Sequence, residues 1–435
     1  MLQDGTDITG TLPKPLSVDE PVQHYLSSTS TFLTNHILNI AFSPCSKYLA
    51  VPKQDIYGRD RVVVIRCSDW HSTIKDEELS IHNQFSCTAT CWSLAFGKRH
   101  HETEAKDVPI QKKLLMLSRR RSSLSAVNRR FDFTKDLFLA AGLADGKINI
   151  WDINTGELML VLKDHQSTVR CLSFTSTSMQ LASCSSDSTV KLWDLLDDGN
   201  MYKTLNEWSD VVYSVKWSPD ETLLCITGPV GHLALHNTVQ WSTPMKLVGH
   251  IHNVVDCSFS SDSALLATAS FDTRVIVWST STGEILKECY HKTPMPSLIY
   301  AGGDNGAYVR CVQFSKNNDY LVTVCDDNKV RWFPLSKKNG FPIYEKDQSN
   351  VLSIACTKDG RTLAIGTRNG EVHLWSTLYS LPPKLKNLCR IKLNSVASLK
   401  RNQLSDLPLS HQLYLYLLYK DLLPVSQTVQ KKLSK

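Results

Sequence analysis

The stretch from His165 to Asp194 reads HQSTVRCLSFTSTSMQLASCSSDSTVKLWD. Apolar and polar residues alternate within three short runs, and Ser, Thr and Asp separate the runs. A period of two bounded by turn-forming residues predicts short β-strands joined by tight turns. A second stretch, from His250 to Trp278, repeats the pattern with the same spacing. The chain therefore contains an internal repeat built from strands.

The repeat extends over most of the chain. One predicted strand of the unit ends in tryptophan five times, at Trp151, Trp193, Trp278, Trp332 and Trp375. A sixth unit, midway between Trp193 and Trp278, has His236 at this place, and Arg61–Arg66 supplies a seventh. Units of about 40–45 residues with four short strands are typical of β-propellers. We therefore predict an all-β fold, a seven-bladed propeller over residues 22–379, preceded by an N-terminal extension (1–21).

The segment before the first unit has a predicted role in closing the ring. Residues Val22–Leu33 precede a strand predicted over Ile37–Phe42. We expect Val22–Leu33 to supply the outermost strand of the last blade, because joining the two ends of the chain in one sheet removes an exposed edge.

Two units carry four polar residues at matching distances. These are His165, Ser183, Asp187 and Trp193 in one unit, and His250, Thr268, Asp272 and Trp278 in the other. We expect Asp to accept from His, and the hydroxyl to link His to the indole, so that each buried polar group has a partner. Other units keep only parts of the set, such as Asp145 with Trp151 and Asp326 with Trp332. The pattern resembles the WD-repeat family and makes these histidines structural.

Composition restricts the class of protein. Of 435 residues, 42% are hydrophobic and 21% charged, which is typical of a soluble globular chain. No apolar run is long enough to span a membrane, and the start of the chain, with Asp4 and Asp7, is no secretory signal. Thirteen cysteines without a disulfide-like spacing favour a reducing compartment, the cytoplasm or nucleus.

One segment accounts for the net charge of +6. Residues 98–136, predicted to be a long surface loop, hold eleven Lys or Arg against five Asp or Glu, a surplus of six. The loop includes Arg119–Arg121 followed by Ser122 and Ser123. A solvated loop, a nuclear-import, nucleic-acid or phospholipid patch, and a kinase site are all compatible with this run. The neutral remainder argues against nucleic acid as a partner. A second insertion lies around Thr293–Asp304.

The alternation of strands stops after Trp375, and the tail predicts helices. One amphipathic stripe has the spacing i, i+3, i+4 and i+8, in Leu385, Leu388, Cys389 and Leu393. Leu407-Pro408-Leu409 interrupts the pattern, and Ser410 is placed to cap a second helix in which Leu413, Tyr416 and Leu417 share a face. These apolar faces need cover, either from the propeller or from another protein.

The tail also resembles a known module. Leu385-x3-Cys389-x3-Leu393 resembles the elongin-binding part of the SOCS box, here residues 380–420. Leu407, Pro408 and Leu409, with Leu413 and Tyr416, are similar to its cullin-5-directing part, with Ser410 at the place of a second proline. Residues 421–435 would be a C-terminal extension. Further local matches lie at Cys91–Gly97, Asp197–Met201, Phe271–Val275 and Ala301–Gly303. With them the whole chain resembles the WD-repeat and SOCS-box-containing protein family.

The resemblance implies a function. Members of this family are similar to substrate receptors of cullin–RING ubiquitin ligases. The box would bind elongin C, with elongin B, and cullin-5 with its RING subunit, while the propeller would hold a protein substrate. Ubiquitin transfer would belong to the E2 brought by the RING subunit, so the receptor itself would not be an enzyme. A scaffold protein without ligase activity is the alternative.

The sequence contains no convincing catalytic or metal-binding constellation. Gly142–Lys147 lacks the spacing of a phosphate loop, and His250 with His252 lacks zinc-site companions. We therefore expect no catalytic residue, metal or cofactor. Propellers of this type bind partners where loops enter the innermost strands. The candidate substrate-binding residues there are Arg170, Tyr213, Asp256, Phe271 and Arg310.

Overall fold

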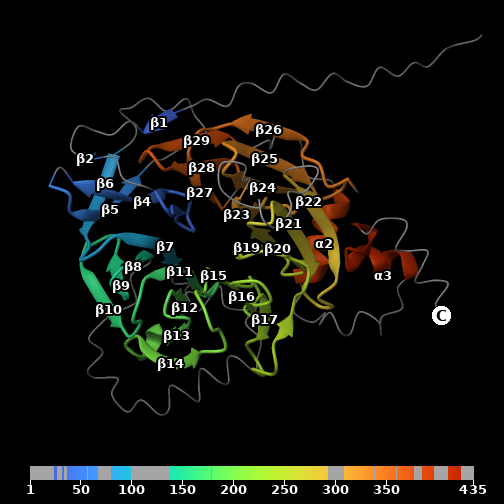
Figure 1. Cartoon of the computed structure of the whole chain (residues 1–435), viewed down its shortest axis with the longest axis horizontal. Helices are drawn as coiled ribbons and strands as arrows, with labels where there is room; N and C mark the ends of the chain where they lie inside the picture. Colours follow the sequence, from blue (N-terminus) through green and yellow to red (C-terminus); the bar gives the residue numbers. More distant parts are fainter. Residues whose placement is uncertain are drawn as a thin grey trace, which may run out of the picture.

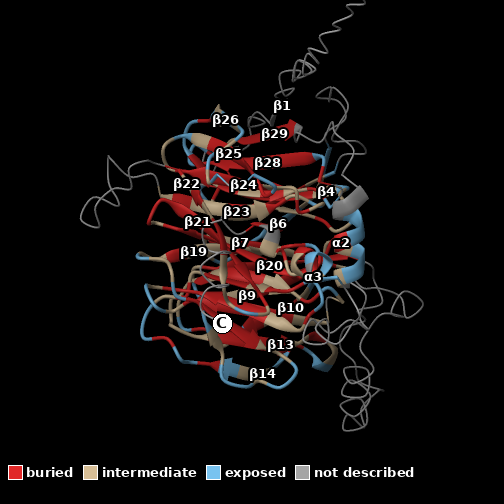
Figure 2. Ribbon diagram, turned by 90° about the vertical axis from the view of Figure 1, so that its right-hand side faces the viewer, coloured by how far each residue is buried: buried red, intermediate tan, exposed pale blue. Residues whose placement is uncertain are grey.

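The computed structural model describes residues 24–26, 32–33, 37–55, 57–66, 80–98, 137–177, 179–291, 308–337, 339–358, 360–376, 385–395 and 410–422. Within these residues the strands form seven antiparallel sheets, which are arranged as blades around a central axis (Figure 1). The seven-bladed propeller predicted from the repeat is confirmed. Seen from the side, the strands are mostly buried and the exposed residues lie mainly in the turns (Figure 2). None of the described helices is long and apolar enough to cross a membrane.

The strands follow one another blade by blade. The first blade contains β2 (Phe32–Leu33), β3 (Ala41–Phe42), β4 (Tyr48–Asp55), β5 (Asp60–Arg66) and β6 (Ser80–Ser86). The second contains β7 (Cys91–Lys98), β8 (Leu137–Leu143), β9 (Lys147–Asp152) and β10 (Leu158–Lys163). The third contains β11 (Val169–Phe174), β12 (Gln180–Ser185), β13 (Val190–Asp194) and β14 (Asn200–Leu205). The next two contain β15 (Ser214–Trp217), β16 (Leu223–Thr227), β17 (Ala234–Asn237) and β18 (Met245–Lys246), and then β19 (Val254–Phe259), β20 (Leu265–Ser270), β21 (Arg274–Ser279) and β22 (Ile285–Tyr290). The last two contain β23 (Val309–Phe314), β24 (Tyr320–Cys325), β25 (Lys329–Pro334) and β26 (Tyr344–Asp347), and then β27 (Val351–Cys356), β28 (Thr362–Thr367), β29 (Val372–Ser376) and β1 (His24–Leu26).

The antiparallel order gives the propeller two different faces. The chain enters the innermost strand of a blade at one face, and the turn between the second and third strands lies at that same face. We call it the entry face. Turns between the first and second strands, and between the third and fourth, lie at the opposite, exit face. β7 ends and β8 begins at the exit face, and residues 99–136 between them, like residues 292–307, lie outside the described residues.

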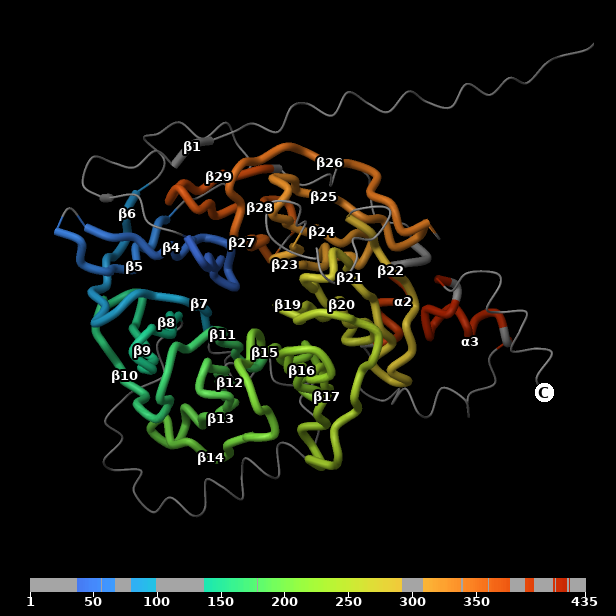
Figure 3. Tube along the Cα trace, in the orientation of Figure 1, coloured from blue at the N-terminus to red at the C-terminus, as the bar shows by residue number. Residues whose placement is uncertain are grey.

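The two ends of the propeller meet in the seventh blade. His24–Leu26 pairs with β29 as its outermost strand, which confirms the predicted closure (Figure 1). The first and seventh blades lie side by side in the ring, with β4 beside β27 (Figure 3). The inner strands are joined as well, because the Ile37 amide donates to the Thr367 carbonyl at 3.1 Å. The prediction was too broad in one respect: Phe32–Leu33 pairs with β4 and so belongs to the first blade. Ring closure thus uses a short piece of the segment expected for it.

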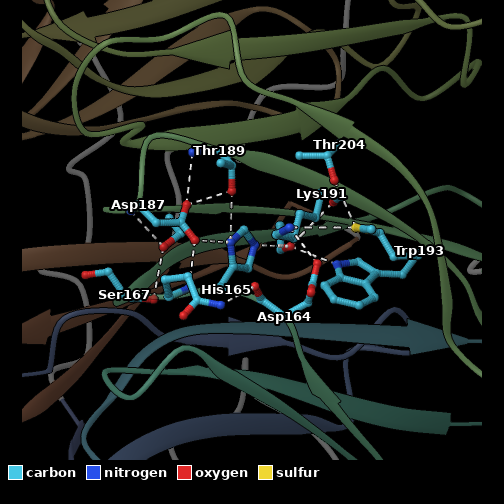
Figure 4. A network of polar contacts seen from close by, with 12 residues as sticks. Asp164, His165, Ser167, Asp187, Thr189, Lys191, Trp193 and Thr204 are labelled. Carbon is cyan, nitrogen blue, oxygen red and sulfur yellow. Dashed lines mark hydrogen bonds and ion pairs between the residues drawn. The ribbon is translucent and has the colours of Figure 1, made fainter.

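Two blades contain the predicted hydrogen-bond network. In the third blade His165 lies 2.8 Å from both the Asp187 carboxylate and the Ser183 hydroxyl, to which the Trp193 indole donates at 2.8 Å (Figure 4). The fifth blade repeats it: His250 lies 2.8 Å from Asp272 and 2.7 Å from Thr268, and Trp278 donates to Thr268 at 2.8 Å. Burial raises the pKa of Asp272, but His250, the Arg274 guanidinium and the Ile251 amide together outweigh burial and lower it to about 2. The histidines are structural, as expected.

The sixth blade corrects one of the partial matches. Asp326 and Trp332 do not form part of such a network, because Trp332 lies on the other side of the strand and stacks on Trp375. His291 takes the histidine place and lies 2.7 Å from Thr323, while Phe333 occupies the tryptophan position, opposite Leu321. The sequence match was wrong because the tryptophan of this blade stands one residue before the network position, which Phe333 occupies ten residues after Thr323, as Trp193 follows Ser183.

This difference yields a prediction about stability. Thr268→Val would leave both Trp278 and His250 without their partner, whereas Thr323→Val would affect His291 alone. Each buried group left unsatisfied costs about 1–3 kcal/mol. We expect Thr268→Val to lower the free energy of unfolding about twice as much as Thr323→Val. Chemical denaturation of the two variants measures this, and equal losses would contradict it.

Two helices follow the propeller, as predicted. They are α2 (Leu385–Ser395) and α3 (His411–Leu417), and the turn η6 (Lys420–Leu422) comes directly after α3. Ser410 caps α3, because its side chain accepts a hydrogen bond from the Leu413 amide. The described part of this region, residues 385–395 and 410–422, is called the C-terminal box below. A further short turn, η3 (Leu195–Asp197), lies between β13 and β14.

Candidate functional site

The first helix of the C-terminal box presents its apolar side outward. Leu388 and Leu393 are 39% and 41% exposed, and Cys389 on the same side is exposed too. Arg390 is buried, and Asn394, on the opposite side of the helix, is half-buried. An ordinary surface helix turns its apolar stripe toward the core and its polar side to water. In α2 this arrangement is reversed.

Asp262 is the centre of the contact between box and propeller. It lies in the exit-face turn between β19 and β20 and is 3% exposed. Its carboxylate accepts hydrogen bonds from the Tyr419 hydroxyl at 2.7 Å and from the Asn394 amide at 3.0 Å. Asn318, in the matching turn of the sixth blade, donates to the same carboxylate at 3.3 Å. The box is therefore attached where the fifth and sixth blades meet.

Apolar and stacking contacts complete this attachment. Tyr419 and Leu422 pack into the apolar cluster that lies between the fifth and sixth blades. The Arg390 guanidinium lies over the rings of Tyr416 and Tyr419, 3.4 and 4.1 Å from their centroids. Burial, together with the charge of Asp262, raises the pKa of Tyr419 well above its usual value, so this phenol stays a hydrogen-bond donor. The box is held by its polar side and by the residues after α3.

The contact leaves one apolar surface uncovered, which we call the exposed stripe. Its members are Leu388, Cys389 and Leu393 of α2. Leu413, on α3, is 40% exposed as well. Three of the four predicted adaptor-binding residues therefore lie together at the surface. The side chain of the fourth, Leu385, is not among the described ones, and Leu407, Pro408 and Leu409 lie outside the described residues. Tyr416 is buried against Arg390.

The innermost strands of several blades contain β-bulges at the entry face. Five of these strands shift register between their first and third residues, which leaves one bulged residue at the mouth of the propeller. The bulged residues are Trp92, Arg170, Val255, Arg310 and Leu352. Bulges turn side chains away from the sheet and are common beside functional sites. The structure thus adds Trp92 to the arginines predicted from the sequence, and aligning the repeat units at Val169 would have found it.

Aromatic and charged side chains gather at the mouth between the fifth and sixth blades. Phe271 and Tyr308 have ring centroids 4.2 Å apart, and the Arg310 guanidinium lies 5.1 Å from the Phe271 ring. Asp326 neutralises Arg310, because the guanidinium donates to both carboxylate oxygens at 2.7–3.0 Å. Asp326 therefore has a role at the surface in place of the network role expected for it.

The remaining candidates lie at different depths. The Tyr213 hydroxyl accepts from the Asn253 side chain at 3.1 Å at the entry face. Asp256 lies in β19 and farther from the entry face, where its carboxylate accepts hydrogen bonds from the Ser214 hydroxyl and from the Val312 amide of the next blade. Burial raises the pKa of Asp256. Its contacts join blades four to six, which is a structural role. No group of His, Cys, Asp and Glu that could hold a metal occurs among the described residues.

The two surfaces lie on opposite faces of the ring. The contacts of the C-terminal box go to exit-face turns, including an ion pair of 3.5 Å between Lys420 and Glu284 in the turn after β21. Arg170, Phe271 and Arg310 lie at the entry face. A protein bound to the exposed stripe and a protein bound at the entry face would therefore not compete for the same residues.

Comparisons with known proteins agree with this architecture. The model for "WD domain, G-beta repeat" matches residues 156–194 and 241–279, and the model for the "Anaphase-promoting complex subunit 4 WD40 domain" matches residues 312–380. The chain is 38% identical over 360 residues to WD repeat and SOCS box-containing protein 1 of Xenopus tropicalis, covering 81% of this chain and 79% of that protein. Identity to the Homo sapiens protein of the same name is 39% over 336 residues, or 77% and 75% of the two chains.

Proposed function

Because the chain belongs to the WD repeat and SOCS box-containing protein family, we propose that it is the substrate-recognition subunit of an elongin–cullin–RING ubiquitin ligase. In this role the C-terminal box binds elongin C, with elongin B, and cullin-5 with its RING subunit. The propeller holds the protein to be modified. The chain contributes placement and no catalytic step, and it acts in the cytoplasm or nucleus, where these partners occur.

The outward-facing apolar stripe on α2 is the observation that carries the proposal. Leu388, Cys389 and Leu393 remain exposed although the box packs tightly on the propeller through its other side. Burying a leucine side chain contributes about 1.5–3 kcal/mol. A helix that leaves such residues in water gains by binding a second protein, and these are the positions at which the SOCS-box pattern places elongin.

The arrangement of the two faces supports the mechanism. A receptor accelerates transfer by holding the substrate near the charged E2, which raises the effective concentration of the substrate lysine. This requires simultaneous binding of adaptor and substrate. The exit-face attachment of the box leaves the entry face open for the substrate, so both can bind at once.

Reconstitution tests the proposal. The purified full chain is mixed with the elongin B–elongin C pair and then with cullin-5 and its RING subunit, and complexes are separated by size-exclusion chromatography. We expect all five proteins to co-elute, and the complex to transfer ubiquitin from a charged E2 to lysines of the receptor or of a bound protein. Failure to bind the elongin pair would overturn the proposal. Elongin binding without cullin recruitment or transfer would instead favour the scaffold function.

A further inference from the structure

Arg170 and Arg310 occupy the same bulged position in two different blades, but their surroundings differ. Arg310 forms a two-point ion pair with Asp326. Arg170 donates only through Nε, to the Ser186 hydroxyl at 2.7 Å, and forms no ion pair with a carboxylate of the described residues. Of the two arginines, Arg170 alone keeps a positive charge that no acidic side chain of the described residues balances.

The Arg170 guanidinium is held by its neighbours and is partly shielded from water. It lies over the Trp92 ring, 4.4 Å from the centroid. This flat ring of the second blade, called the shelf below, supports the guanidinium from one side. Tyr213 of the fourth blade lies close enough to Arg170 for the two groups to interact electrostatically. The Arg170 side chain is half-buried, which deprives its charge of part of its water and lowers its pKa. A half-buried cation held in one orientation gains more from an incoming anion than a mobile surface lysine does.

The shape of the guanidinium identifies the anion. Nε is occupied by Ser186, which leaves the two terminal nitrogens to donate side by side. Two parallel N–H groups fit the two oxygens of one carboxylate, and the single positive charge matches its single negative charge. A phosphate dianion would call for more than one unpaired cation.

We propose that the entry face recognises an acidic segment of its partner protein through Arg170, which binds an Asp or Glu carboxylate on the shelf formed by Trp92, with Tyr213 beside it. This inference rests on the proposed function only in naming the partner as the substrate. The rings of Phe271 and Tyr308, which lie at the same face between the fifth and sixth blades, would then contact uncharged residues of the same segment.

Peptide binding by the full chain, in complex with the elongin pair, tests this inference. A random-sequence peptide library is selected on the wild-type complex, and we expect the selected peptides to be enriched in Asp and Glu. One selected peptide is then compared with its Gln-for-acid version by fluorescence anisotropy. Charge-assisted hydrogen bonds predict that Arg170→Gln weakens the acidic peptide about 10- to 100-fold and leaves the Gln version unchanged. Arg170→Lys keeps the charge but loses the pair of parallel N–H donors, so its affinity for the acidic peptide should lie between those of the wild type and Arg170→Gln.

A charge-neutral control separates the site from general electrostatics. The double variant Arg310→Gln with Asp326→Asn removes an ion pair without changing net charge, and it should bind the acidic peptide as the wild type does. Thermal unfolding checks that each variant folds. Absence of acidic enrichment, an Arg170→Gln effect below about threefold, or an equal loss in the control overturns the inference. Tighter binding of a phosphoserine version by more than about tenfold overturns it as well, in favour of phosphate. Elongin binding, measured on the same samples, reports separately on the proposed function.

Discussion

Replacing Leu388 and Leu393 together by alanine is expected to weaken binding of the elongin pair about 10- to 50-fold while leaving the propeller as stable as before. Full burial of a leucine contributes about 1.5–3 kcal/mol, and since only about two-fifths of each residue remains for a partner to bury, the pair accounts for about 1.2–2.4 kcal/mol. A few central apolar residues dominate the affinity of most protein interfaces. Both side chains are about two-fifths exposed in the free chain, so their truncation removes little from the folded state. Isothermal calorimetry with purified elongin B–elongin C measures the loss.

Leu158 offers a matched control for this experiment. It is the same residue type, 48% exposed, and lies on β10 at the outer edge of the second blade, away from the box. Leu158→Ala should leave elongin affinity unchanged. Unaltered affinity of the double variant, with the control behaving as expected, would show that the exposed stripe does not bind the adaptor.

The second large effect is expected from Asp262→Ala, which should release the C-terminal box from the propeller. The substitution leaves the Tyr419 hydroxyl and the Asn394 and Asn318 amides without their shared acceptor. Three groups at about 1–3 kcal/mol each give a loss of about 3–9 kcal/mol, and we expect the lower half of this range because Asn394 is half-buried and also donates to the Leu417 carbonyl. Hydrogen exchange should show α2 and α3 losing protection while the strands of the other blades keep theirs.

Asp220→Ala is the control for the loss of hydrogen bonds within the turn itself. Asp220 occupies the matching turn of the fourth blade, where it accepts from the Ser218 hydroxyl at 2.5 Å as Asp262 accepts from Ser260 at 2.6 Å. Asp220→Ala therefore removes the turn contacts alone. The difference between the two variants measures the attachment of the box, and Tyr419→Phe should reproduce part of it. Equal destabilisation by Asp262→Ala and Asp220→Ala would mean that the box is not attached in solution.

The predictions from sequence succeeded where one local pattern fixes one local structure. The blades, the two complete networks and the Ser410 cap all depend on residues close together in the chain. They failed where the tryptophan does not stand at the usual place: in the sixth blade Trp332 comes one residue before the network position, so it lies on the opposite side of the strand, and His291 and Phe333 occupy the network places. A one-residue shift in a strand exchanges its two faces, and the tryptophan alone could not reveal it.

By itself the sequence determined the seven-bladed ring and the two amphipathic helices of the tail, because periodicity and caps act over a few residues. Only the tertiary structure decided which side of α2 faces water. That choice depends on Asp262, more than a hundred residues away in the chain, which draws Asn394 and Tyr419 toward the propeller. Likewise, the Arg170 and Arg310 positions are equivalent in the repeat, and their charges differ in effect because the position that holds Asp326 beside Arg310 holds Ser186 beside Arg170. Contacts between distant segments carry this information, and no local pattern contains it.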